Sequence, residues 1–167
     1  MCLDLIKHSP KPFVAETDIV CYKFMRKLSR KQYQTPFQCM EILIGEKYSI
    51  NEMRVRKLFT DDEINTAAVP DDTYVGSVHD GFHSLPSIKT AYYETLMFSR
   101  RRVVKCVIPK GSTYFIGDFN GVISYASNNI VYVRSYSKFS TFFLCLFKSR
   151  MKFSVDNLNK LIDKLCV

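Results

Sequence analysis

VVKCVIPKGSTYFIGDFNGVISYASNNIVYV, residues 103–133, is the most regularly patterned part of the chain. It begins with an apolar run that ends at Pro109-Lys110-Gly111, and an aromatic segment follows. Asn120-Gly121 then supplies a dipeptide typical of tight hairpin turns. We therefore expect four strands joined by short connections, at Val103–Ile108, Thr113–Gly117, Val122–Tyr125 and Ile130–Arg134.

Upstream of this region, Ile19–Met25 (IVCYKFM) is rich in β-branched and aromatic residues and predicts another strand. Shorter strands are expected at Glu41–Ile44 and Tyr74–Val78. Residues 1–18 and 50–72 show no clear period. We predict irregular structure for the first of these segments, and for the second a long excursion with a solvated acidic surface.

Two segments have the apolar spacing of helices. The first covers about Leu85–Phe98, with Ser84 as its expected N-cap. The second, Ser154–Cys166, predicts an amphipathic C-terminal helix. Between them, Phe139–Phe147 is a short apolar run, which we interpret as a further strand or buried segment.

These elements predict an α+β fold: one domain, 1–167, with a mostly antiparallel sheet, single or split, and about two main helices. A chain of 167 residues has the ordinary length of one domain and can bury a core. Hydrophobic residues make up 47% and charged residues 24%, as in soluble globular proteins. The aromatic content of 14% favours strands.

The net charge of +8 favours polyanionic partners such as nucleic acid, anionic lipid or a phosphate-bearing small molecule. A solvated basic surface would also account for it. The six cysteines include no C-x-x-C pair, which argues against a zinc ribbon and fits a reducing interior. We recognise no signal peptide and no apolar run that could span a bilayer, so we expect a cytoplasmic protein; the oligomeric state is left open.

Three groups of residues are candidates for binding. His79, Asp80 and His83 form a compact cluster, in which His83 could contact a bound ring; two histidines offer too few ligands for a metal, and we predict none. Lys110-Gly111-Ser112 could cradle a phosphate, but it lacks P-loop spacing and a plain turn is the simpler interpretation. Aromatic residues could stack a base or form the core, namely Tyr22, Tyr114, Phe115, Tyr125 and Tyr132.

The order of three motifs resembles the ADP-ribosyltransferase family. Tyr22-Lys23 is similar to the Tyr-Arg that begins the family's NAD site, and Phe82-His83-Ser84 is similar to its Ser-Thr-Ser segment. Val107–Ser112 resembles the family's strand ending in Pro-Lys-Gly-Thr/Ser. The resemblance covers about residues 19–134. Beyond it, we expect residues 135–167 to form a C-terminal strand and an amphipathic helix. The resemblance implies a cleft for NAD or another nucleotide, with these ligand-binding candidates: Tyr22, Lys23, His83, Ser84, Tyr125, Ser127 and Asn129.

The departures from that family concern its chemistry. Its catalytic glutamate pair would fall on Ser127 and Asn129, and neither is acidic. An amide can hydrogen-bond to a ribose hydroxyl but cannot neutralise the positive charge that develops on the sugar. Lys23 replaces the arginine and lacks its bidentate fork. The resemblance therefore argues for the scaffold and against ordinary transfer, and we assign no catalytic residue and no required cofactor.

The chain also resembles small uncharacterised proteins of gut bacteria and their phages, in its Tyr-Lys, Gly-Phe-His-Ser and Ile-Pro-Lys-Gly-Ser segments. We expect a non-catalytic binding protein whose partner is a nucleotide-type small molecule or, for a phage protein in the host cytoplasm, a host protein. One alternative is a divergent ADP-ribosyltransferase or NAD-processing enzyme with His83 and Ser84 in its site. The other is a nucleic-acid-associated or structural phage protein that uses the basic surface.

Overall fold

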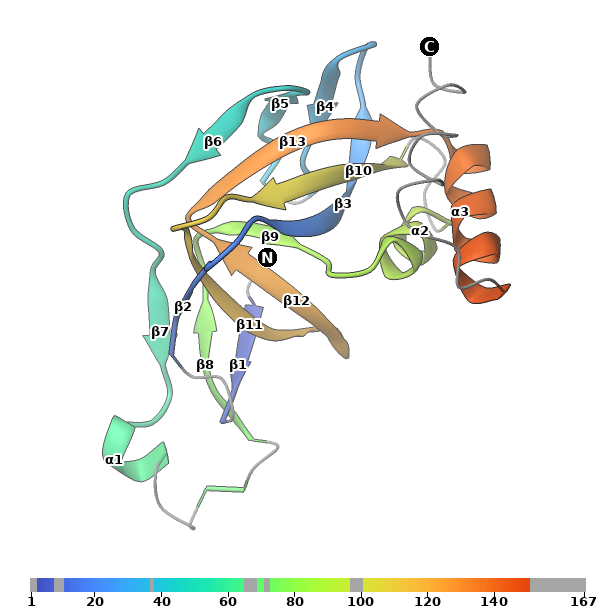
Figure 1. Ribbon diagram of the computed structural model, residues 1–167. Coiled ribbons are helices and arrows are strands. Elements are labelled where there is room, and N and C mark those ends of the chain that lie inside the picture. Colours follow the sequence, from blue (N-terminus) through green and yellow to red (C-terminus); the bar gives the residue numbers. More distant parts are fainter. Residues whose placement is uncertain are drawn as a thin grey trace.

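The computed structural model describes residues 3–7, 11–36, 38–64, 69–70, 73–96 and 101–150, which form two antiparallel sheets (Figure 1). The first sheet has the order β7 (Val55–Lys57), β8 (Tyr74–Val78), β1 (Leu3–Ile6), β11 (Thr113–Phe119), β12 (Val122–Ser127) and β9 (Phe82–Ser84), and β2 (Phe13–Val14) pairs with β11. The second has the order β5 (Glu41–Leu43), β4 (Gln32–Gln34), β3 (Ile19–Lys27), β10 (Arg101–Ile108), β13 (Asn129–Tyr136) and β6 (Lys47–Ser49).

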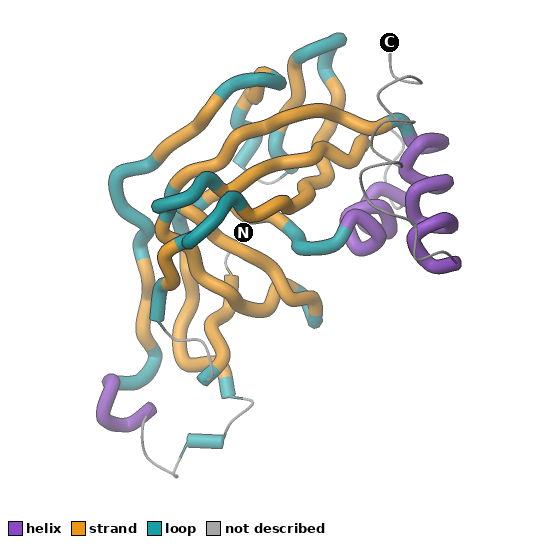
Figure 2. The backbone as a smooth tube through the Cα atoms, in the orientation of Figure 1, coloured by secondary structure: helices purple, strands orange, loops and turns teal. Residues whose placement is uncertain are grey.

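Helices lie at the ends of the molecule, and strands fill its middle (Figure 2). The helices α2 (Ile88–Leu96) and α3 (Lys138–Arg150) pack beside β3 and β10, and the short α1 (Asp61–Ile64) lies at the opposite end. No helix among the described residues is long and apolar enough to cross a membrane. The predicted α+β class, with a mostly antiparallel, split sheet and two main helices, is confirmed.

The largest buried cluster joins side chains from both sheets. Cys21, Met25, Val104, Cys106 and Tyr132 of the second sheet pack with Phe82 of the first. A second cluster lies where α2 and α3 meet β3, and a third lies against β1 and β8 of the first sheet. Burial of this apolar surface is the main force that holds the two sheets and the helices together.

The hairpin predicted at Asn120-Gly121 is confirmed. Asn120 and Gly121 have φ values of 54° and 78°, the left-handed conformation that this dipeptide adopts at low cost. The Gly121 amide donates to Asp118 Oδ1 at 2.7 Å, which fixes the turn. The four strands expected around this turn all form, as β10 to β13, each longer than its prediction.

The predicted start of the first helix is wrong. Ser84 does not cap it, because Ser84 is the last residue of β9 and Leu85 continues in extended backbone. The helix α2 begins three residues after Leu85, and Ser87 caps it, since its Oγ accepts from the Lys89 amide at 3.2 Å. The predicted end at Phe98 lies outside the described residues.

The prediction of a strand or buried segment at Phe139–Phe147 is also wrong, because these residues lie in α3. Ser137 caps this helix, since its Oγ accepts from the Ser140 amide at 3.0 Å. Phe139 is 73% exposed, so the apolar run is not a buried one. A short apolar run without a clear period does not distinguish a strand from a helix. The C-terminal helix predicted at Ser154–Cys166 lies outside the described residues.

The segment predicted to be irregular, residues 1–18, and the predicted excursion, residues 50–72, both contain regular elements. Residues 1–18 contribute β1 and β2, and Leu3 and Leu5 of β1 are fully buried in the third cluster. Residues 50–72 contribute β7 and α1. Thr60 and Glu63 form a reciprocal capping box at α1, because the Thr60 amide donates to Glu63 Oε2 at 2.7 Å and the Glu63 amide donates to Thr60 Oγ1 at 3.3 Å.

Gly117 on β11 is expected to tolerate no larger residue. A Cβ at this position would collide with the Asp4 carbonyl oxygen of β1 and lie 2.8 Å from Leu3 Cγ. Gly117→Ala should therefore lower the free energy of unfolding by about 3 kcal/mol in urea denaturation. Ile123→Ala, at a position 64% exposed on the neighbouring strand, is the control and should change it by less than about 0.5 kcal/mol. Equal stability of both variants would contradict the tight packing of β1 on β11.

Two buried tyrosines differ in one hydrogen bond, which predicts opposite effects of the same substitution. The Tyr33 hydroxyl donates to Ser135 Oγ at 2.5 Å, whereas the buried Tyr132 hydroxyl has no hydrogen-bond partner among the described residues. In urea denaturation, Tyr33→Phe should lower the free energy of unfolding by about 1 kcal/mol, and Tyr132→Phe should raise it by about 1 kcal/mol. A loss of stability in Tyr132→Phe would show that this hydroxyl is satisfied by water.

Candidate ligand pocket

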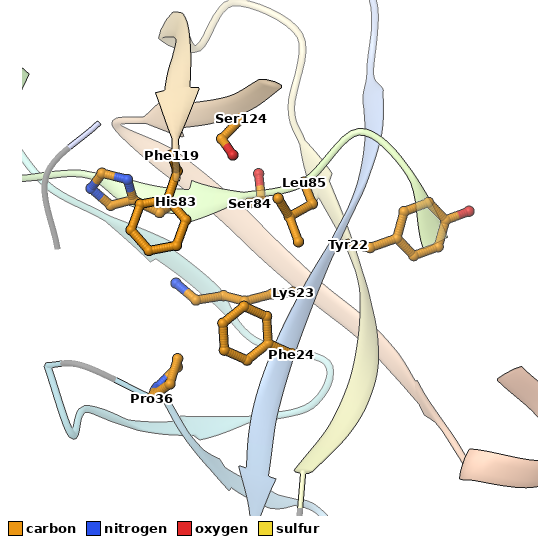
Figure 3. A pocket seen from close by; sticks show the side chains of 9 residues that line it. All are labelled: Tyr22, Lys23, Phe24, Pro36, His83, Ser84, Leu85, Phe119 and Ser124. Carbon is orange, nitrogen blue, oxygen red and sulfur yellow. The ribbon is translucent and has the colours of Figure 1, made fainter. Parts of the chain in front are cut away.

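A pocket lies at the junction of the two sheets, with walls from both of them (Figure 3). The second sheet provides residues of β3, and the first provides residues of β9, β11 and β12. The lining side chains are those of Tyr22, Lys23, Phe24, Pro36, His83, Ser84, Leu85, Phe119 and Ser124.

A main-chain bridge brings β9 against β3. The Tyr22 amide donates to the Leu85 carbonyl at 2.8 Å, and the Leu85 amide donates to the Tyr22 carbonyl at 2.7 Å. Because β9 also pairs with β12, the bridge joins the edge of the first sheet to the second. It therefore sets Lys23 of β3 beside His83 and Ser84 of β9.

Lys23 is the charged group of this pocket. Its side chain is buried, with 5% of its surface exposed, although lysine is among the residues least often buried. No Asp or Glu is among the lining residues that the structure describes. Burial lowers the pKa of Lys23 to about 8, so the amine is mostly protonated at pH 7 but close to its titration range. A buried ammonium without a carboxylate attracts an anion or another group that accepts hydrogen bonds.

His83 and Ser84 add unsatisfied polar atoms. Both ring nitrogens of His83 and the Oγ of Ser84 are buried and have no hydrogen-bond partner among the described residues. Burial, and secondarily the charge of Lys23, lowers the pKa of His83 to about 3, so its ring is neutral at pH 7. A neutral imidazole offers one donor and one acceptor. Buried polar atoms without partners are rare, and a bound water or ligand is a common reason for them.

Two cysteines lie behind Lys23. Cys21 and Cys106 face each other directly across β3 and β10, and both are fully buried. The neighbouring Cys106 thiol is the largest cause that lowers the pKa of Cys21, while burial raises the pKa of Cys106 well above its ordinary value; Cys106 Sγ itself donates to the Val104 carbonyl at 3.6 Å. Ser84 lies close enough to Cys21 to lower that pKa further, but sulfur is a weak acceptor and Ser84 Oγ makes no full hydrogen bond with it.

The pocket is small in this conformation. Its cavity measures about 20 Å³, which is room for about one water molecule. Sites for small organic ligands commonly measure about 300–1,000 Å³. A larger ligand must therefore enter at the mouth or displace side chains of the wall, of which Phe24, Pro36 and Phe119 are the apolar members outside the bridge.

The structure brings four of the sequence-predicted site residues together and leaves three apart. Tyr22, Lys23, His83 and Ser84 all line the pocket. Tyr125 lies opposite Ser84 on β12, but its ring packs edge-on against Tyr114 at 5.8 Å.

Ser127 and Asn129 lie at the connection of β12 and β13 and are not among the lining residues. Their polar atoms have protein partners there. Ser127 Oγ donates to the Asn129 carbonyl at 2.8 Å, and Ser49 Oγ donates to Asn129 Oδ1 at 2.6 Å. The two residues are therefore occupied in holding the strand connection.

The sequence interpretation missed Phe24, Pro36, Leu85, Phe119 and Ser124 as lining residues. The sequence could have pointed to Ser124 through strand alternation, which places Ser124 and Ala126 on the same face of β12. That face is buried, and a serine is unusual at a fully buried strand position. Leu85 was assigned to a helix, which concealed its extended backbone. The other three reach the pocket only through tertiary packing.

The histidine cluster does not converge in the structure. His83 is buried, His79 is exposed with its Nε2 3.1 Å from Ser77 Oγ, and Asp80 forms an ion pair with Arg54. No group of three or more His, Cys, Asp or Glu side chains placed to hold a metal occurs in the described part of the chain.

The Lys110-Gly111-Ser112 turn has no free amide for a phosphate. The three amides donate in turn to Asp18 Oδ1 at 2.9 Å, the Ala15 carbonyl at 2.8 Å and the Pro109 carbonyl at 3.1 Å. The segment acts as a strand-ending turn. Of the aromatic candidates, Tyr22, Phe115 and Tyr132 belong to buried clusters, which fits the core interpretation for these three.

Comparison with known proteins gives no relative of this chain. No family model matches it, and neither the curated proteins nor the solved structures contain a significant match. A functional assignment therefore depends on the pocket itself.

Proposed function

We propose that this protein binds the anionic group of a nucleotide-type small molecule in the pocket around Lys23. The observation that carries the proposal is a buried lysine in a pocket whose described lining includes no acidic side chain, together with the unsatisfied atoms of His83 and Ser84. Different oxygens of a phosphate group would accept from the ammonium and from the Ser84 hydroxyl, and charge-assisted hydrogen bonds are stronger than neutral ones. The rings of Phe24 and Phe119 provide apolar surface for the rest of the ligand.

The scaffold we propose is a degenerate ADP-ribosyltransferase-like one. The meeting of the Tyr22-Lys23 strand with the His83-Ser84 strand supports it, because the resemblance assigns both motifs to one nucleotide site. The lining, as far as the structure describes it, holds no carboxylate that could stabilise a positively charged sugar. These groups support binding better than transfer.

Thermal denaturation with pyrophosphate, NAD, ADP-ribose and cyclic nucleotides tests the proposal. A ligand at 100 times its Kd should stabilise the fold by about 2.7 kcal/mol and raise the Tm accordingly. Lys23→Met should abolish the shift and Lys23→Arg should retain part of it, because arginine keeps the charge. Lys110→Met removes an exposed lysine outside the pocket and should leave the shift unchanged. No shift with any of these compounds would count decisively against an anion pocket.

A further inference from the structure

We propose that Lys23 captures small terminal aldehydes in this pocket as an imine, with His83 and Ser84 transferring the protons. This goes beyond anion binding, because a covalent bond forms at the lysine nitrogen. It depends on three properties of the pocket, namely a buried amine with no acidic side chain among the described lining residues, neutral proton-transfer groups in the same lining, and a cavity of limited size.

The first property is the position of the amine. The Lys23 side chain extends from β3 into the pocket, and its amine lies on the side where His83 and Phe119 are placed (Figure 3). The titratable groups that affect the pKa of Lys23 are Cys21 and Cys106, and the charge of Lys23 lowers the pKa of His83. An ion pair with a carboxylate would hold the amine in its unreactive protonated form, and the described part of the lining has no carboxylate.

The reactive form of the amine is well populated here. Only a neutral amine attacks a carbonyl carbon, and desolvation in an apolar pocket is a known way to produce it. Because burial lowers the pKa of Lys23 to about 8, roughly a quarter of the molecules carry the neutral amine at pH 7.5. For an ordinary lysine with a pKa near 10.4, the fraction is roughly 0.1%.

The second property is the supply of proton carriers. The lysine lone pair attacks the carbonyl carbon, the N–C bond forms, and the carbonyl π electrons move to oxygen. One proton then passes from nitrogen to that oxygen and gives a carbinolamine. A second proton from nitrogen leaves as the C–O bond breaks, so that the hydroxyl departs as water and a C=N bond remains. Neutral His83 accepts at one ring nitrogen and donates at the other, and Ser84 Oγ can do both.

The third property, the size of the cavity, selects the carbonyl compound. Space for about one water accommodates the carbonyl oxygen and afterwards the water that leaves. A terminal aldehyde has one substituent, which can point through the mouth of the pocket. A ketone has two, and the second would meet the wall of Phe24, Leu85 and Phe119. An aldehyde that also carries an anionic group would use the protonated fraction of Lys23 to bind first.

Reductive trapping of the full-length protein tests this proposal. The protein is incubated at pH 7.5 with glyoxylate and sodium cyanoborohydride, and each modified lysine is identified by peptide mass mapping. Lys23 should be modified at least tenfold faster than the exposed Lys27 and Lys110. Its rate should level off above about pH 8, while the rates of the exposed lysines continue to rise. Burial alone protects a lysine from reagents, so equal or slower modification of Lys23 would overturn the proposal.

Two variants separate this chemistry from anion binding. Lys23→Arg keeps the charge but cannot form an imine, so it should lose the fast labelling and retain a thermal shift with pyrophosphate. His83→Gln should slow labelling at Lys23 about tenfold and leave Lys110 unchanged; an unchanged rate at Lys23 would refute the part assigned to His83. Fast labelling of Lys23 without a thermal shift in pyrophosphate would refute anion binding but leave imine capture standing. A thermal shift in pyrophosphate without fast labelling of Lys23 would refute imine capture but leave anion binding standing.

Discussion

Lowering the pH from 6.5 to 4 is expected to cost the protein on the order of 3 kcal/mol of its free energy of unfolding through His83 alone. Burial lowers the pKa of His83 to about 3 in the folded state, whereas a histidine in an unfolded chain titrates near 6.5. Between these values the unfolded chain binds a proton that the folded chain does not. A falling pH therefore favours unfolding, and the stability is complete only above the unfolded pKa.

Urea denaturation of the wild type and of His83→Gln at pH 7, 5 and 4 isolates this contribution. Glutamine is polar and does not titrate, so groups other than His83 affect both proteins alike. The stability of the wild type relative to the variant should fall by about 3 kcal/mol across the series. Parallel curves for the two proteins would show that His83 can be protonated in the folded state.

Lys23→Met is expected to stabilise the fold at pH 7 by on the order of 3 kcal/mol. The pKa of Lys23 falls to about 8 in the folded state, against 10.4 or slightly more in an unfolded chain. Below pH 8 both states carry the proton, and the folded state bears the full cost of a buried ammonium. Methionine has a similar length and no charge, so it fills the same space without that cost.

The pH dependence of this gain provides its check. As the pH rises from about 8 to above 10, the folded wild type loses the proton first and its stability rises, so the advantage of Lys23→Met should shrink by pH 10. Lys110→Met, at an exposed position, should change little at either pH. A variant less stable than the wild type at pH 7 would mean that the ammonium has a partner that stabilises it. If Lys23→Met is more stable than the wild type but no longer binds the anionic ligand, Lys23 is retained for function at the expense of stability.

The parts of the fold that depend on neighbouring residues could be predicted from the sequence. Asn120-Gly121 specified its hairpin because the left-handed backbone of the turn is a local property of these two residues. The strand containing Tyr22 and Lys23 followed from its β-branched and aromatic content. The beginning of α2 could not be predicted in the same way, because Leu85 leaves the helix to bond with Tyr22, which lies far from it in the chain.

The same distinction applies to the candidate site. Lys23 and His83 could be selected as candidates because each stands in a short local pattern, and both line one pocket in the structure. Nothing local shows that Lys23 is buried without an acid, since that depends on strands from both sheets. Ser127 and Asn129 were placed by family spacing, and the structure uses them instead to hold the connection between β12 and β13.

The bridge between Tyr22 and Leu85 also bears on how fast a ligand could come and go. It consists of two main-chain hydrogen bonds beside β9, and because Tyr22 and Leu85 both belong to the buried cluster under the helices, it should open only rarely. Because both bridging residues line the pocket, breaking the bridge would loosen the wall without unfolding either sheet. The residence time of a bound molecule would then follow the opening rate of this bridge, and exchange of the Tyr22 and Leu85 amides with solvent deuterium would report that rate under conditions where every opening leads to exchange.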